Sequence, residues 1–248
     1  MNEERFIEFE DHDGIGVMSM DNRPHNYIIR PDFIDIPAMK EWIAGKRLKG
    51  IIITGKGNHF SAGADIEELG KLAADPDALL SGMRQGKDAL AFIESLEIPV
   101  IAAIKGACFG GGLEIALSAH IRVAAETAMF AFPESGLGMI PGMGGTVRLP
   151  HAAGRGAAVE MILRGEIMNA ERGRAIGIVD YVVPKKEVMD FSTGLMKKMV
   201  EKRPLEIINA VMRSVRNAAV MDFDSAMEEE SRLFCRLAVK QMKDRDAQ

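Results

Sequence analysis

Residues 100–117 read VIAAIKGACFGGGLEIAL, and the interpretation of the whole chain starts from this stretch. The short apolar run at 100–104 predicts a buried strand, and the helix formers after the glycines predict a helix over 112–119. Glycine inside a helix or strand costs roughly 0.5–1 kcal/mol relative to alanine. The three glycines at 110–112 therefore indicate a turn at which the backbone itself has to be approached closely.

A second segment has the same design. Residues 51–69 read IIITGKGNHFSAGADIEEL, which is again a strand, a glycine, a short loop and a small-residue turn that opens a helix. The first N–H groups of a helix have no internal partner and the helix dipole is positive there, so such turns offer donors to a negative oxygen. We expect the N–H groups of Ala64 and Gly111 to converge as an oxyanion hole. Tight helix–strand packing is the alternative for either segment alone.

Two glutamates lie close to these turns in the sequence. Glu114 falls in the first turn of the helix after the glycines, and Glu134 follows an apolar run at 129–132 and Pro133. If the strands at 100–104 and 129–132 are neighbours, both carboxylates emerge at one sheet edge, where they could hold a water and act as base and acid. Helix capping by Glu114 and an exposed strand end at Glu134 are the alternatives. The predicted chemistry is proton transfer next to a carbonyl group.

The order of apolar runs predicts the fold class. Glycine-bounded strands are expected at 14–20, 50–54, 100–104, 129–132 and 177–183, with helices between them at 32–48, 77–96, 112–119 and 154–164. This alternation predicts an α/β fold with parallel pairing. From about residue 186 the pattern is helical, with breaks expected at Pro204 and 222–224. We predict a core over 1–185 and a helical region over 186–248, whose apolar stripe makes self-association an expectation.

Composition restricts the partners. The 248 residues carry a formal net charge of −5, which indicates neither nucleic acid nor an anionic membrane as a partner. The apolar runs are shorter than the ~20 residues that span a bilayer, and the acidic, polar first residues do not resemble a signal peptide. Cys108 and Cys235 lie outside any metal-binding spacing and are expected to be buried thiols. The sequence predicts a cytoplasmic protein without metal, membrane or nucleic acid.

Four other patterns have structural explanations. The glycines of GLGMIPGMGG (136–145) do not have the spacing of a dinucleotide-binding turn. Residues 11–13, Asp-His-Asp, are explained by a polar turn rather than a metal site. His59 is expected to contact backbone, and Ser61 has no His or Asp partner at a recognisable spacing.

Five ordered blocks resemble the crotonase superfamily, the enoyl-CoA hydratase and isomerase family. They are MDNRP (20–24), TGKGNHFSAGADIEEL (54–69), IPVIAAIKGACFGGGLEIALSAHIRVA (98–124), FPESGLGMIPGMGGTVRLPHAAGR (132–155) and AERGRAIGIVDYVV (170–183). The resemblance implies a spiral of repeated ββα units with a C-terminal helical region, assembled as homotrimers or pairs of trimers.

The resemblance also implies an activity. Family members bind a coenzyme A thioester with its carbonyl in an oxyanion hole, which here corresponds to Ala64 and Gly111. In the hydratases one glutamate, matching Glu114, activates the water that adds at the β-carbon, and a second, matching Glu134, protonates the α-carbon. The substrate is further expected to contact Ala62, Asp65 and Ile66 at the nucleotide end, and also Gly110, Tyr27 and Phe132.

The predicted function is therefore that of an enoyl-CoA hydratase, a hydro-lyase of fatty acid metabolism. It needs no cofactor, since coenzyme A is part of the substrate. A double-bond isomerase that depends mainly on Glu134, another acyl-CoA reaction, and a non-catalytic binding module are the alternatives.

One run of four residues, two single residues and the C-terminus depart from the family pattern. Residues 25–28, His-Asn-Tyr-Ile, replace a run of small residues, so Tyr27 is expected to reshape the pocket. Phe132 is expected to make the wall beside Glu134 bulkier. His120 replaces a common aspartate and is expected to be structural. The final residues lack a clear counterpart of the family's Phe- and Lys-bearing helix.

Overall fold

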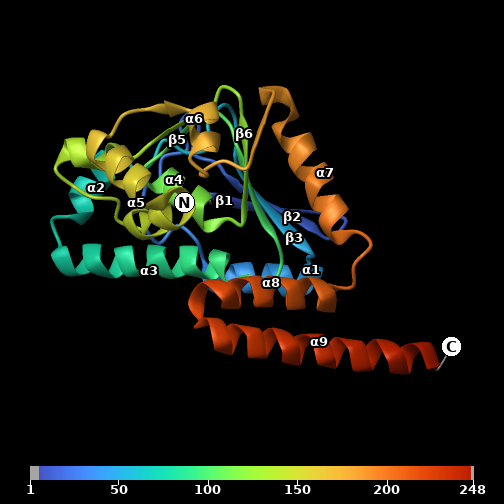
Figure 1. The fold of residues 1–248 in the computed structure, drawn as a ribbon. Helices are drawn as coiled ribbons and strands as arrows, with labels where there is room; N and C mark the ends of the chain where they lie inside the picture. Colours follow the sequence, from blue (N-terminus) through green and yellow to red (C-terminus); the bar gives the residue numbers. More distant parts are fainter. Residues whose placement is uncertain (1–5, 247–248) are drawn as a thin grey trace.

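The computed structural model describes residues 6–246, which form two β-sheets surrounded by helices (Figure 1). The larger sheet has the order β1-β2-β3-β4-β6-β9 and the smaller one the order β5-β7-β8. The strands are β1 Ile7–His12, β2 Ile15–Met20, β3 Gly50–Gly55, β4 Val100–Ile104, β5 Ala107–Phe109, β6 Ile121–Ala125, β7 Met129–Ala131, β8 Met168–Asn169 and β9 Tyr181–Val183.

Strand pairing in the larger sheet is parallel except at its first edge. β1 and β2 form an antiparallel hairpin, and β2, β3, β4, β6 and β9 then pair in parallel. The hairpin turn is polar, with the Gly14 N–H donating to Asp11 Oδ1 at 3.0 Å. The polar turn predicted at residues 11–13 is confirmed.

Helices follow the strands in a repeating order. The helices of this part are α1 Ile36–Lys46, α2 Ile66–Leu72, α3 Pro76–Glu94, α4 Gly111–Ser118, the 3₁₀ helix η1 Pro133–Leu137, α5 Gly145–Arg164 and α6 Ala170–Ala175. After β4 the chain enters β5 and then α4, and after β6 it enters β7 and then η1 and α5. The segment after β3 follows the same course, since Ser61 forms a parallel bridge with Cys108 of β5. Each turn of this spiral adds one strand to the large sheet and one short segment to the second layer.

The core lies around β3 and β4, whose residues are all buried. Both strands read as continuous apolar runs because both sheet faces are covered, as is usual for parallel sheets. Helix α7 (Val188–Val200) packs against β3, β4 and β6, and its Val188, Met196 and Val200 join the core. The 3₁₀ helix η2 Lys185–Glu187 leads into it.

Two further helices follow α7. Helix α8 (Leu205–Val220) begins directly after Pro204, and α9 (Phe223–Asp246) begins after Asp222, whose Oδ1 accepts from the Ser225 N–H at 2.9 Å. The two predicted breaks are confirmed. In Figure 1, α9 runs alongside α8 and away from the sheets. The pair exposes large apolar side chains: Val211, Val215, Val220, Phe223, Met227, Phe234, Val239 and Met242.

Several sequence predictions differ from the structure. The strand expected at 177–183 is limited to β9, because Gly177 turns the chain at a φ of 89°. The helix expected at 154–164 begins already at Gly145 and is interrupted at Gly154. Cys108 is buried as predicted, but Cys235 is exposed on α9 because that face has no neighbour within the described chain. Among the helices of residues 6–246, none combines the length and apolar character needed to cross a membrane.

Candidate active site

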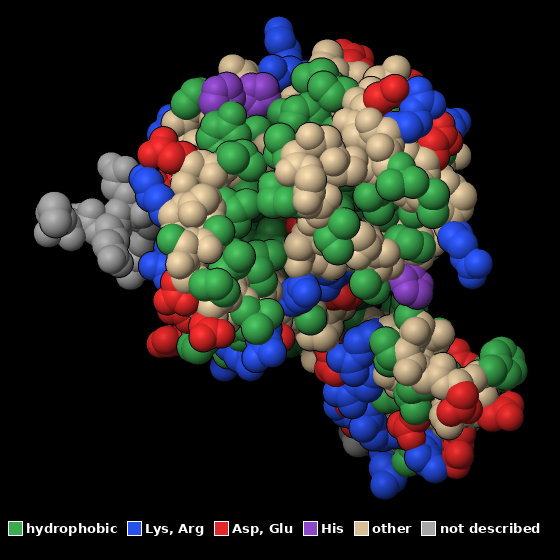
Figure 2. Space-filling view, turned by 90° about the vertical axis from the view of Figure 1, so that its left-hand side faces the viewer, with side chains coloured by type: hydrophobic (Ala, Val, Ile, Leu, Met, Phe, Trp, Pro, Cys, Tyr) green, Lys and Arg blue, Asp and Glu red, His purple; other side chains and the backbone are tan. Residues whose placement is uncertain are grey.

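A cavity of about 590 Å³ opens between the two glycine turns, α2, α3 and the segment after β7. Figure 2 shows hydrophobic side chains gathered around a hollow on the face that carries these elements. Its apolar lining includes Ile28, Pro31, Leu69, Leu72, Leu79, Met83, Leu137, Met139, Ile140 and Met143. Ala64, Gly111, Glu114 and Glu134 line the same cavity, so it brings together the four residues that we predicted as catalytic.

The two glycine turns lie side by side. The Ser61 N–H donates to the Ala107 carbonyl at 3.1 Å, and the Phe109 N–H donates to the Ser61 carbonyl at 3.0 Å. A Cβ added to Gly112 would lie 2.5 Å from the Ser61 carbonyl oxygen, well inside van der Waals contact. A glycine is therefore required at residue 112 for the two turns to approach each other.

The N–H groups of Ala64 and Gly111 are free to bind a ligand. Ile28 donates to the Gly63 carbonyl at 2.9 Å and accepts from the Asp65 N–H at 3.0 Å. In a parallel bridge of this kind the residue between those two partners directs its own N–H to the other side. Gly111 is the first residue of α4, where helix N–H groups have no internal acceptor. Neither N–H has an acceptor among the residues that the structure describes.

Glu114 is buried on α4 with only 2% of its surface exposed. Its Oε1 accepts from the N–H groups of Met143 and Gly145, both at 2.7 Å. Burial raises the pKa of Glu114, while the two backbone donors and the positive charges of Arg148 and Lys87 oppose that rise. The donors favour the ionised form of the carboxyl group and so limit the rise in its pKa.

Glu134 has a different environment. It lies in η1 and is half-buried, and a Cβ added to Gly110 would lie 2.7 Å from its Oε1. Its Oε2 is buried without a hydrogen-bond partner in the described chain. Burial raises the pKa of Glu134 to about 7; its own backbone N–H opposes this rise and the charge of Glu114 adds to it. The carboxyl group therefore keeps its proton more readily than an exposed glutamate.

The small sheet brings the two glutamates together. β4 and β7 lie in different sheets, so the adjacency that we considered for the strands at 100–104 and 129–132 is wrong. Instead β5 pairs with β7, and the Gly110 N–H donates to the Ala131 carbonyl at 2.9 Å. Because α4 follows β5 and η1 follows β7, Glu114 and Glu134 reach the cavity from neighbouring parallel strands.

Five of the six residues predicted to bind substrate line the cavity: Tyr27, Ala62, Asp65, Ile66 and Gly110. Asp65 also caps α2, since its Oδ1 accepts from the Glu67 N–H at 3.0 Å. Phe132 is the exception. It is fully buried behind the cavity, and its ring lies 2.8 Å from the position of a Cβ built on Gly145. Its ring packs beneath the start of α5 and does not line the cavity, which corrects our prediction that it makes the wall beside Glu134 bulkier.

Sequence reasoning missed two parts of the lining. Leu79 and Met83 stand four residues apart on α3, a spacing that places both on one helix face. The loop at 139–145 contributes Met143, whose N–H binds Glu114. The helical spacing could have identified the α3 pair, whereas nothing local identified the loop as a partner of Glu114.

The predicted structural histidines are confirmed. His59 Nδ1 accepts from the Ala107 N–H at 3.0 Å, and His120 Nδ1 accepts from the Val100 N–H at 3.0 Å. Across residues 6–246 no group of three or more His, Cys, Asp or Glu side chains is arranged to hold a metal ion.

Comparison with known proteins agrees with this geometry. The family model for enoyl-CoA hydratase/isomerase matches residues 10–245. A Bacillus subtilis (strain 168) protein described as a probable enoyl-CoA hydratase is 38% identical over 188 residues, covering 75% of this chain and 72% of that protein. The chain belongs to the enoyl-CoA hydratase/isomerase family.

Solved structures of similar proteins confirm the fold. An enoyl-CoA hydratase subunit I from Geobacillus kaustophilus HTA426 has a TM-score of 0.85 and 28% identity, covering 98% of this chain and 93% of that one. An enoyl-CoA hydratase from Thermoplasma volcanium GSS1 has a TM-score of 0.80 and 30% identity, covering 95% and 93%. The predicted crotonase-type α/β fold is therefore confirmed.

Proposed function

We propose that this protein is an enoyl-CoA hydratase, which adds water reversibly and syn across the α,β double bond of an acyl-CoA thioester. The observation that carries the proposal is the meeting of buried Glu114, half-buried Glu134 and two free N–H donors in one cavity. The names of the relatives in Bacillus subtilis and Thermoplasma volcanium support hydration as the reaction.

The N–H groups of Ala64 and Gly111 bind the thioester carbonyl oxygen in this proposal. Negative charge moves onto that oxygen as water adds, so donors that are already in place stabilise the enolate more than the substrate. Donors of this kind contribute about 2.7–4 kcal/mol each in other enzymes. Gly111 also begins α4, whose dipole is positive at this end.

The environments of the glutamates support separate roles. The two backbone donors favour ionised Glu114, which takes a proton from water as the water oxygen bonds to the β-carbon. The raised pKa of Glu134, about 7, favours its protonated form, which gives that proton to the α-carbon. The π bond is replaced by one C–O and one C–H bond, and proton return from Glu114 to Glu134 restores the starting state.

These steps use only side chains, backbone and water, so we propose that no metal or redox cofactor takes part. Coenzyme A enters as part of the substrate, with its nucleotide end near Ala62, Asp65 and Ile66. The exposed apolar side chains of α8 and α9 support a homo-oligomer, either a trimer or a dimer of trimers. A cytoplasmic location and a role in fatty acid metabolism belong to the same proposal.

The test is the loss of enoyl-thioester absorbance on mixing the protein with crotonyl-CoA. Rapid loss in the wild type, abolished in both Glu134→Gln and Glu114→Gln, is the expected result. Double-bond migration that survives Glu114→Gln would identify an isomerase instead. Binding of coenzyme A esters with neither reaction, over a panel of acyl groups, would overturn the catalytic proposal in favour of a binding module.

A further inference from the structure

Both donors to Glu114 come from one short loop. Its Oε1 accepts from the N–H groups of Met143 and Gly145 at 2.7 Å each. The Met143 N–H belongs to the peptide group that joins Gly142 to Met143, and the Gly145 N–H belongs to the one that joins Gly144 to Gly145. The peptide group between them joins Met143 to Gly144. Backbone N–H groups that point at one anion in this way form a nest. The orientation of the middle peptide therefore determines whether both donors point at Glu114.

Arg148 holds the middle peptide. Its Nη1 donates to the Met143 carbonyl at 2.9 Å. Its guanidinium is itself held by Glu94 at the end of α3, with Nε and Nη2 each 3.1 Å from Oε2. Only 12% of the Arg148 side chain is exposed. Gly144 has a φ of 108°, in the positive range that glycine adopts readily because it has no Cβ. The hydrogen bond from Arg148 therefore restrains a peptide group that could otherwise rotate easily.

We propose that Arg148 is a positioning residue for the hydration reaction. It holds the N–H groups of residues 143–145 in place against Glu114, and these donors keep this base ionised and oriented toward the water that adds to the substrate. The catalytic part of this proposal rests on the proposed hydratase function. Arg148 itself is not among the residues that line the cavity, so it acts through the Met143 peptide and not by touching the substrate.

The charges around Glu114 agree with this role. Three groups face it: Glu134 from η1, Lys87 from α3 and Arg148 from α5. Arg148 and Lys87 both lower the pKa of Glu114 against the effect of burial. Loss of Arg148 removes one of these positive charges and loosens both backbone donors. Both changes disfavour the carboxylate, so the pKa of Glu114 rises further.

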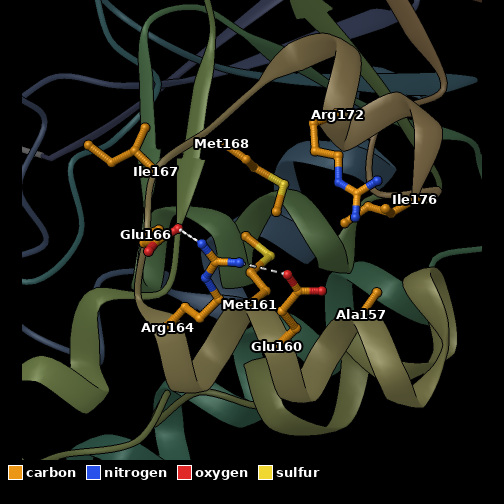
Figure 3. A pocket seen from close by; sticks show the side chains of 9 residues that line it. All are labelled: Ala157, Glu160, Met161, Arg164, Glu166, Ile167, Met168, Arg172 and Ile176. Atoms are coloured by element: carbon orange, nitrogen blue, oxygen red, sulfur yellow. Dashed lines mark hydrogen bonds and ion pairs between the residues drawn. The ribbon is translucent and has the colours of Figure 1, made fainter.

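The experiment compares Arg148→Met with Arg164→Met. Arg164 lies on the same helix but pairs with Glu160 and Glu166 at the surface, beside a smaller cavity (Figure 3). Arg164→Met therefore makes the same chemical change without affecting the 143–145 nest. The Glu114 carboxyl carbon is followed by ¹³C NMR over a pH series and assigned by its loss in Glu114→Gln. Glu114 should titrate at higher pH in Arg148→Met than in the wild type, and at the wild-type pH in Arg164→Met.

Hydration of crotonyl-CoA gives the second readout. Arg148→Met should lower kcat by about 10- to 100-fold with KM nearly unchanged. Loss of the hydrogen-bond partners that orient metal ligands has an effect of this size at metal sites. Wild-type titration of Glu114 in Arg148→Met would overturn the proposal. If that variant does not fold, Arg148→Lys replaces it: lysine cannot bridge Met143 and Glu94 together, so a smaller upward shift is expected and an unshifted titration again overturns the proposal. The titration needs no substrate, so a wild type without hydratase activity would refute the proposed function, while the titration would still decide whether Arg148 holds the nest on Glu114.

Discussion

Gly110→Ala is expected to damage the reaction more than the fold. Gly110 has φ 47° and ψ −120°, which L-residues rarely adopt, so alanine there costs about 1–3 kcal/mol of stability. A Cβ at this position would lie 2.7 Å from Glu134 Oε1, whereas ordinary contact begins at 3.4 Å. Glu134 has to move by about 0.7 Å, and a displacement near 1 Å can cost about 10²-fold in rate. We therefore expect kcat to fall by about 10- to 100-fold.

The assay is crotonyl-CoA hydration beside thermal unfolding of the same samples. Gly136→Ala is the matched control, because it lies in η1 itself and an added Cβ there meets no atom within 4 Å. The control should keep wild-type kcat and the wild-type unfolding temperature or slightly above. Wild-type kcat in folded Gly110→Ala would show that Glu134 does not have to hold this position, and the acid role assigned to it would be refuted.

Four further results are expected. Hydration should decline as pH rises through about 7, because burial raises the pKa of Glu134 to about 7 and only its protonated form gives a proton; kcat/KM that stays level to high pH would contradict this. The same raised pKa means that the folded state holds a proton which the unfolded state releases, so the unfolding temperature should fall as pH rises from the usual carboxyl range to about 7. Gly112→Ala should lower the free energy of unfolding, measured in urea, by about 1–3 kcal/mol, because its Cβ would overlap the Ser61 carbonyl. Gly194→Ala on α7 should not lower the free energy of unfolding in this way, because its Cβ would point into open space. Phe234→Asp on the exposed face of α9 should lower the mass in light scattering with helix content retained; an unchanged mass would exclude this face from a subunit interface.

Local patterns accounted for the strands that are buried on both faces. β3 and β4 were predicted within one residue, because a parallel strand covered on both sides reads as an unbroken apolar run. β1 and β6 were not predicted, since each has residues that are only half-buried or exposed and the apolar signal is interrupted. β5 is three residues long, too short for any periodicity to show.

The candidate site divides in the same way. Ala64, Gly111, Glu114 and Glu134 were proposed from residue type and position, because glycine turns and helix starts are local features. Phe132 was misjudged, since a residue next to a predicted acid was assumed to face the same cavity. The direction of its side chain is set by packing against Gly145, which no local pattern contains.

The sequence by itself determined the repeated order of strand, glycine turn and helix, and with it the residue types offered to the cavity. Only the tertiary structure decided that β5 pairs with β7, that Glu114 binds the loop at 143–145, and that Arg148 and Glu94 hold that loop. The physical reason is that periodicity and turn chemistry act over a few residues, whereas these contacts join residues far apart in the chain. Their formation depends on how all the surrounding layers pack at once.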